Sequence, residues 1–198
     1  MNTQHKKNRL TILVIFAMSV IPFVIAWYLA KNPDTVRLGT NNGDLINPPV
    51  PTEFGEFSGY DAFTAENLKE LQGHWVLINP VSETQCGEVC RDALHKTRQI
   101  SLMMGKDISR IRRAAILFEK TDRSPFSGEW QDDARLLKIV ASTPLHEKLG
   151  KIAGSPIAEG MLLIMDPLGN LMMKYPASFD PYKVRNDLSK LLRISQIG

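Results

Sequence analysis

The sequence of 198 residues contains only two cysteines, so it cannot be a small scaffold held together by several disulfide bridges. Internal repeats and low-complexity tracts are absent. With 43% hydrophobic and 23% charged residues, the composition is that of a globular protein and excludes disorder, collagen-like repeats and a polytopic membrane protein. Phosphate-binding loops, HExxH motifs and Ser/His/Asp patterns are also missing, so hydrolase and nucleotide chemistry have no support.

The net positive charge of the sequence comes entirely from its N-terminal segment. Residues 1–30 contain Lys6, Lys7 and Arg9 and no acidic residue, which leaves 21 basic and 21 acidic residues in the remainder. A neutral domain has no electrostatic basis for binding nucleic acid, and we expect no such partner.

One long hydrophobic run is present, LTILVIFAMSVIPFVIAWYLA at residues 10–30. At the rise of an α-helix, its length corresponds to about 30 Å, the thickness of a bilayer core. Pro22 is tolerated within such a helix, and Trp27 and Tyr28 lie where an interfacial aromatic belt is found. A cleaved signal peptide would have a shorter apolar region followed by small residues, so we expect an uncleaved transmembrane anchor.

Basic residues before the anchor predict its orientation. Positive charge favours the cytoplasmic side, so residues 1–9 are expected to be a cytoplasmic tail and everything after the anchor to lie in the periplasm. We therefore expect a single-pass protein of the inner membrane. Residues 31–55 are rich in Pro, Gly and Asn and lack periodicity, which is typical of a linker. The folded domain is then expected to comprise residues 56–198.

Apolar periodicity in this domain predicts a mixed α/β fold. In chain order, we expect a strand at residues 75–78, a helix at 87–104, strands at 114–118 and 136–140, and a helix at 143–152. A hairpin of two strands at 161–165 and 171–175 and a final helix at 181–195 follow. Asn79-Pro80 is expected to end the first strand. Such an order requires a sheet with helices on its faces. With a cysteine pair between the first strand and its helix, it matches a thioredoxin-like plan.

The two cysteines, Cys86 and Cys90, lie at this strand-to-helix junction. Residues four apart share one helix face, with Cα atoms about 6 Å apart, which is within disulfide reach. The helix N-terminus favours a thiolate at Cys86, and a thiolate is both a nucleophile for disulfide exchange and a soft ligand for Cu(I). A small structural disulfide is the alternative, although so short a ring constrains the unfolded chain little. Zinc would need more ligands than this spacing supplies.

Residues 64–90, TAENLKELQGHWVLINPVSETQCGEVC, resemble the Sco/SenC family. Its members are anchored thioredoxin-like proteins that assist assembly of the copper A centre of cytochrome c oxidase. The shared pattern is Gly73-His-Trp-Val-Leu77 followed by Thr84-Gln-Cys-Gly-Glu-Val-Cys90. The hairpin MLLIMDPLGNLMMKYP and the loop Asp122-Arg-Ser-Pro125 are also similar to segments of the family, and the resemblance covers residues 57–195.

The chain departs from this family at the third copper ligand, a histidine shortly before the hairpin. The corresponding segment, Ser155-Pro-Ile-Ala-Glu-Gly160, contains none. His74, His95 and His146 are expected to be ordinary surface residues, and the methionines of the hairpin to belong to apolar strand faces.

The resemblance implies a membrane-anchored periplasmic protein that assists cytochrome c oxidase assembly. The cysteine pair and the missing histidine favour thiol–disulfide exchange over copper binding as its chemistry. Cys86 would be the attacking thiolate and Cys90 the resolving thiol, and the partner would be a protein, such as an oxidase subunit or assembly factor. One alternative is a Cu(I) chaperone of the Sco type, in which Cys86 and Cys90 bind copper with an unrecognised third ligand. The other is a non-catalytic assembly partner whose cysteines form a structural disulfide.

Overall fold

The computed structural model describes residues 3–32, 41–81, 86–119, 125–126, 128–154, 157–195 and 197. Two compact units divide the chain, residues 1–40 and residues 41–198.

The first unit contains one long helix, α1 (Thr3–Lys31). Its segment Arg9–Lys31 is long and apolar enough to cross a membrane. Pro22 lies inside the helix without ending it. The hydroxyl of Ser19 donates to the carbonyl oxygens of Ile15 and Phe16, so this polar group is satisfied within the helix, as apolar surroundings require. The expected N-terminal apolar helix is confirmed.

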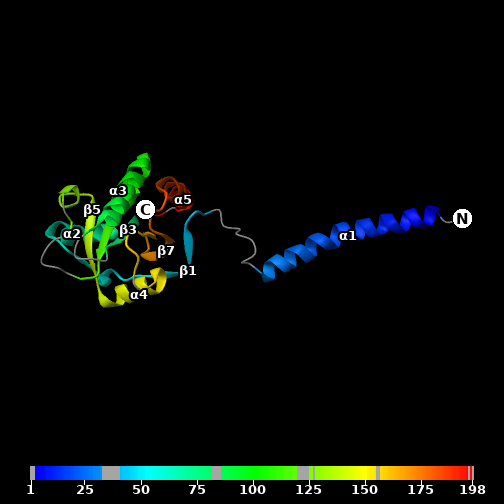
Figure 1. The fold of residues 1–198 in the computed structure, drawn as a ribbon, viewed down its shortest axis with the longest axis horizontal. Helices are drawn as coiled ribbons and strands as arrows, with labels where there is room; N and C mark the ends of the chain where they lie inside the picture. Colours follow the sequence, from blue (N-terminus) through cyan, green and yellow to red (C-terminus); the bar gives the residue numbers. More distant parts are fainter. Residues whose placement is uncertain are drawn as a thin grey trace. The chain divides into compact units, whose positions relative to one another are not determined.

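In the described part of the second unit, seven strands form one sheet with helices on both faces (Figure 1). The spatial order is β1-β7-β6-β3-β4-β5-β2. The strands are β1 (Asp44–Pro51), β2 (Phe57–Gly59), β3 (Trp75–Val81), β4 (Ile111–Leu117), β5 (Leu136–Ala141), β6 (Leu162–Met165) and β7 (Asn170–Tyr175). The α-helices are α2 (Ala62–Asn67), α3 (Glu88–Met103), α4 (Thr143–Ala153) and α5 (Pro181–Ile194). Short 3-10 turns occur at Phe54–Glu56, Leu68–Leu71, Gly105–Arg110 and Gly128–Trp130.

Strand β3 shows how the sequence positions the helices. It pairs in parallel with β4 and antiparallel with β6, so it lies inside the sheet, and all its residues are buried. Trp75 and Leu77 belong to a core shared with α3 and α5, whereas Val76 and Ile78 belong to a core shared with α4. This alternation follows from the two-residue period of a strand. The thioredoxin-like α/β class expected from the sequence is confirmed.

Strand β3 extends beyond its expected end, and strand β1 forms where the sequence predicts a linker. Asn79-Pro80 does not end β3, because the pairing with β4 continues through Pro80 to Val81. The pairing with β6 stops at Ile78, before the proline. Residues 31–55 are expected to be linker from their composition, yet Asp44–Pro51 form strand β1 against β7. An edge strand pairs on one side only, so it tolerates prolines that an interior strand would not. Residues 33–40 lie outside the described residues.

Candidate functional site

The two cysteines form a disulfide at the start of α3. Their Cα atoms are 5.3 Å apart, within disulfide range, although Cys86 precedes the helix rather than lying on it. Gly87, between them, is the N-cap of the helix, and Cys90 lies in its first turn. The bridge therefore lies where the chain enters α3, after the carboxyl end of the central strand β3.

Both cysteines are buried, with exposed fractions of 4% for Cys86 and 2% for Cys90. The surrounding core contains two aromatic side chains, Phe126 and Trp130, together with aliphatic residues of β3, α3 and β4. The main-chain N–H of Cys86 donates to the carbonyl oxygen of Pro125 at 3.0 Å. Apolar burial disfavours a thiolate, whereas the helix N-terminus favours one, so the two influences on a reduced Cys86 oppose each other.

A carboxylate approaches the start of α3 from the segment before β6. A Cβ atom placed on Gly87 would lie 3.8 Å from Oε1 and 3.9 Å from Oε2 of Glu159. Oε1 of Glu159 is buried and has no hydrogen-bond partner among the described residues. The neighbouring Gly160 has a positive φ of 81° and packs against Val89 in the first turn of α3. Segment 157–160 therefore covers the helix end that carries the cysteines.

Each of the three histidines of the domain has contacts of its own. The two ring nitrogens of His74 lie 3.0 Å from the carbonyl oxygen of Gln72 and 2.9 Å from the guanidinium of Arg112. Nε2 of His95 lies 3.0 Å from the side-chain amide of Gln99.

His146, in the first turn of α4, stacks on Phe118 with the ring centroids 4.5 Å apart. Among the residues that the structure describes, no three His, Cys, Asp or Glu side chains are grouped so that they could hold a metal ion. Several residues quoted for the resemblance fall outside the described ranges, namely Thr84, Gln85, residues 122–124 and residues 155–156.

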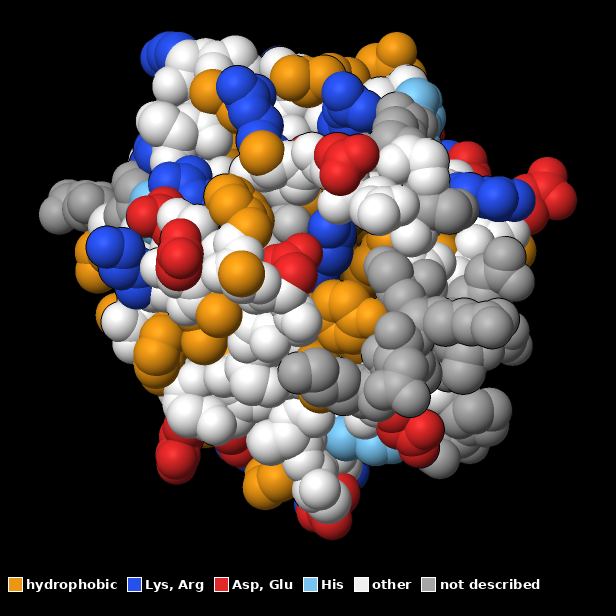
Figure 2. Space-filling model, turned by 90° about the vertical axis from the view of Figure 1, so that its left-hand side faces the viewer, with side chains coloured by type: hydrophobic (Ala, Val, Ile, Leu, Met, Phe, Trp, Pro, Cys, Tyr) orange, Lys and Arg blue, Asp and Glu red, His pale blue; other side chains and the backbone are white. Residues whose placement is uncertain are grey.

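An ion pair between a buried lysine and a partly exposed aspartate borders the aromatic wall of the cysteine core. Nζ of Lys138 lies 3.2 Å from Oδ2 of Asp61 and 5.7 Å from the ring centroid of Phe126, and it donates to the carbonyl oxygen of Gln131. Burial raises the pKa of Asp61, but hydrogen bonds from Thr64 and Lys138 outweigh this and hold the pKa below its usual range. Figure 2, which looks at the side of the domain that carries α2 and β5, shows basic and acidic side chains interspersed.

A second ion pair lies on β4. The guanidinium of Arg113, which is 4% exposed, donates to both carboxylate oxygens of Asp133 at 3.1 and 2.9 Å. Burial raises the pKa of Asp133, but the hydrogen bonds from Arg113 and from the main chain of Arg135 hold it below its usual range. Lys138 and Arg113 are thus buried cations that each pair with a carboxylate.

Parallel central strands, helices on both faces and a cysteine pair at the start of the first crossover helix together define a thioredoxin-like domain. Residues 75–195 match the family described as "Transmembrane-like, thioredoxin-like, C-terminal domain". The match covers more than half of the chain, and the protein belongs to this family.

Several solved structures have the same fold. Apo Sco1 from Thermus thermophilus is 15% identical, with a TM-score of 0.52 over 79% of this chain and 99% of that one. A SCO1/SenC family lipoprotein from Bacillus anthracis is also 15% identical, with a TM-score of 0.51 over 74% of this chain and 99% of that one. Copper-bound yeast Sco1 is 14% identical, with a TM-score of 0.48 over 64% and 83% of the two chains. A search of curated protein sequences finds no match.

Sequence reasoning identified the cysteine pair but missed what surrounds it. Phe126, Trp130 and Glu159 come from segments distant in the chain, and only the fold brings them to α3. One signal was available for Glu159, because it lies in the segment before the hairpin where the resemblance expects a ligand.

Proposed function

We propose that this protein is a membrane-anchored thiol–disulfide protein of the periplasm that assists cytochrome c oxidase assembly. The observation that carries the proposal is the disulfide between Cys86 and Cys90 at the N-terminus of α3. In the reduced form, the Cys86 thiolate would attack a disulfide of a partner protein, forming a mixed disulfide and releasing one partner thiolate. Cys90 would then attack the Cys86 sulfur, which restores the bridge and leaves the partner with two thiols.

Support for the pathway comes from the sequence resemblance to Sco/SenC proteins and from the fold shared with apo Sco1 of Thermus thermophilus. The sequence resemblance to Sco/SenC proteins also supports Cu(I) as a cargo of Cys86 and Cys90. Two thiolates suit Cu(I) as soft ligands. The apolar helix Arg9–Lys31 supports an anchored state, in which the domain would act close to membrane-bound partners.

A second candidate function, a static bridge in an assembly partner, is favoured by the burial of both cysteines. A disulfide that no thiolate can reach exchanges slowly, whatever its equilibrium potential. The two candidates therefore differ in both potential and accessibility, and each can be measured.

The test is a redox titration of the full chain in detergent, across glutathione and dithiothreitol buffers, with a thiol-reactive mass tag to count free cysteines. An exchange protein should become reduced at a potential above about −300 mV. A bridge that stays oxidised below that value would overturn the proposal and leave the structural role. Adding Cu(I) with a competing chromophoric chelator to the reduced chain tests the cargo. Tight one-to-one binding that is lost in His95→Ala or His146→Ala would make the protein a copper chaperone.

Single-cysteine variants separate the roles of the two thiols. With Cys90→Ser, the remaining Cys86 should accumulate a mixed disulfide with a disulfide-bonded peptide. The matched variant Cys86→Ser should accumulate much less, because Cys90 lies within the helix whereas Cys86 lies just before its N-terminus. Equal trapping by both variants would contradict the assignment of Cys86 as the attacking thiol.

A further inference from the structure

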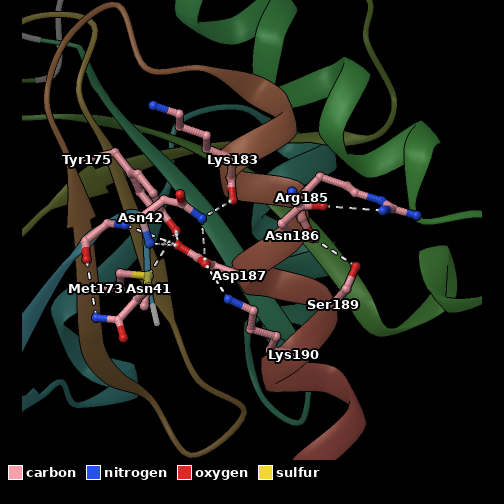
Figure 3. A network of polar contacts seen from close by, with 11 residues as sticks. Asn41, Asn42, Met173, Tyr175, Lys183, Arg185, Asn186, Asp187, Ser189 and Lys190 are labelled. Carbon is pink, nitrogen blue, oxygen red and sulfur yellow. Dashed lines mark hydrogen bonds and ion pairs between the residues drawn. The ribbon is translucent and has the colours of Figure 1, made fainter. Parts of the chain in front are cut away.

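The segment that follows the anchor joins the folded domain at Asn42 and Gly43, which are held against α5 (Figure 3). We call these two residues the entry point. Asp187 of this helix is 2% exposed and accepts hydrogen bonds from the main-chain N–H groups of Asn42 and Gly43, at 2.6 and 3.0 Å. It also accepts from the side-chain amide of Asn42 at 2.9 Å and from the hydroxyl of Tyr175 at 3.0 Å. A buried carboxylate with this many donors holds residues 42–43 firmly against the helix.

Packing reinforces these hydrogen bonds. A Cβ atom on Gly43 would lie 2.5 Å from Cζ of Tyr175, so the main chain approaches the ring more closely than any other residue would permit. The side chain of Asn42 also donates to the carbonyl oxygen of Lys183, in the first turn of α5. The entry point is therefore part of the folded domain rather than part of the linker.

Only ten residues, 32–41, separate the end of α1 from this entry point. Even fully extended, they reach at most about 36 Å. If α1 spans a membrane, the side of the domain on which the chain enters cannot lie farther than this from the end of the anchor.

The exposed surface of α5 next to this entry point is basic. The helix contains four basic residues, and its only acidic residue is the buried Asp187. In residues 41–198 as a whole, 19 basic residues face 20 acidic ones, so the positive charge on α5 is a local feature. None of the ion pairs among the described residues involves the exposed side chains Lys183, Arg185 and Arg193. Two large apolar side chains share this surface, Tyr182 with 69% and Ile194 with 77% exposed.

We infer that the exposed face of α5 docks on the anionic surface of the membrane that holds the anchor. Lys and Arg side chains next to a membrane are attracted by anionic headgroups, and an exposed tyrosine suits the headgroup layer. If α1 spans the membrane, a tether of ten residues raises the local concentration of lipid around the domain. This inference rests on the membrane anchorage in the proposed function, but it does not depend on the chemistry of the cysteines.

The test measures how closely α5 approaches lipid in the full chain, incorporated in nanodiscs. An environment-sensitive fluorophore is attached through Asn186→Cys on the exposed side of α5, with the native cysteines in their disulfide. Lipids with a nitroxide headgroup serve as the quencher. Quenching should be about threefold stronger with about 30% phosphatidylglycerol than with phosphatidylcholine alone, and about 0.5 M salt should remove the difference. The same fluorophore at Glu147→Cys, exposed on α4, should show no such dependence.

Two triple variants with reversed charges, one on α5 and one on other elements, form a matched pair. Lys183→Glu, Arg185→Glu and Arg193→Glu together should abolish the effect of anionic lipid. Lys69→Glu, Arg91→Glu and Lys151→Glu change the net charge equally at exposed positions on other elements and should preserve it. Equal quenching in both lipids would overturn the inference, as would an equal loss of the anionic-lipid effect in both triple variants. An acidic protein would then be the better partner for α5. Failure of the chain to enter nanodiscs would instead refute the anchor, and the redox titration reports on the cysteines separately.

Discussion

Glu159 points its carboxylate at Gly87, the residue between the N-terminal cysteine of the bridge and the first turn of α3. The segment before the hairpin thus places a carboxylate beside the helix end that would stabilise the Cys86 thiolate. A neighbouring negative charge disfavours a thiolate, and the helix N-terminus favours it. Glu159 is therefore in a position to tune the reactivity of Cys86.

We predict that Glu159→Gln makes Cys86 more reactive. In a Cys90→Ser background, the alkylation rate of Cys86 at neutral pH should rise about three- to tenfold, because removing the carboxylate increases the thiolate fraction. The rate is measured with iodoacetamide across a pH series. Glu88→Gln is the control, since Glu88 is exposed in the first turn of α3 and solvent screens its charge. An unchanged rate in Glu159→Gln would show that this carboxylate does not influence Cys86.

We predict that a side chain at position 160 lowers the stability of the domain. The φ of 81° at Gly160 strains any other residue, and a Cβ atom would lie 2.5 Å from Cγ1 of Val89. Gly160→Ala should lower the free energy of unfolding by about 2 kcal/mol. Urea denaturation of Gly160→Ala, with and without Val89→Ala, separates the clash from the backbone strain. If the double variant is as unstable as the single one, backbone strain alone accounts for the loss.

Breaking the buried pair of Arg113 and Asp133 should be costly. Asp133→Asn leaves the guanidinium without its counter-ion and should destabilise the domain by about 3 kcal/mol. Glu70→Gln removes the partner of Arg112, whose side chain is 27% exposed, and should cost less than about 1 kcal/mol. Thermal unfolding of both variants provides the comparison. Similar losses in the two would contradict the importance of burial.

Asp187 should make stability depend on pH in the acid range. Burial raises its pKa, but hydrogen bonds from Asn42, Gly43 and Tyr175 outweigh this, so the folded-state pKa lies below the unfolded value. Its contribution is therefore complete above about pH 5 and is lost as the pH falls through the folded pKa. Asp187→Asn should remove about 2 kcal/mol at neutral pH and flatten the acid limb.

The control for Asp187 is Asp92→Asn. Asp92 is half-exposed and pairs with Lys96 at 2.7 Å, so its loss should change stability by less than about 0.5 kcal/mol. Both variants are compared by urea denaturation from pH 3 to pH 7, a range that brackets ordinary carboxyl pKa values of about 4. An acid limb unchanged in Asp187→Asn would assign the acid sensitivity to the other carboxyls with lowered pKa, such as Asp61 and Asp133.

The basic residues before the apolar run predict the topology of the chain. Alkaline phosphatase, which folds only in an oxidising compartment, should be active when fused after residue 198. The same fusion after Arg9, before the apolar run, should be inactive. An inactive C-terminal fusion in cells that produce the protein would reject the expected orientation.

Elements with a strong apolar period were predictable from the sequence. The helix expected at residues 87–104 is α3, because Ala93, Leu94 and Ile100 lie on one face and are buried together. The closeness of Cys86 and Cys90 follows from their short separation in the chain, although Cys86 lies just before α3 rather than on it. In both cases the relevant pattern lies within one short segment, so the sequence of that segment is enough to predict the structure.

Elements that depend on tertiary context were not predictable. Strand β1 contains Pro48, Pro49 and Pro51, and only the free edge of β7 makes it a strand. Strand β2 has three residues, too few for any period. Phe126 and Glu159 both follow the cysteines in the chain, at distances of more than 30 residues, and neither has a local pattern that indicates its place near the start of α3.

The prolines of β1 also affect how neighbouring copies of this protein meet. Chains confined to a membrane diffuse in two dimensions and collide far more often than the same number of chains free in solution. A sheet that ended in an ordinary strand would then offer a template for strand exchange and fibre growth. Here one border of the sheet lacks three N–H donors, and the other is only three residues long. If α1 anchors the chain in a membrane, this architecture permits crowding there without polymerisation through the sheet.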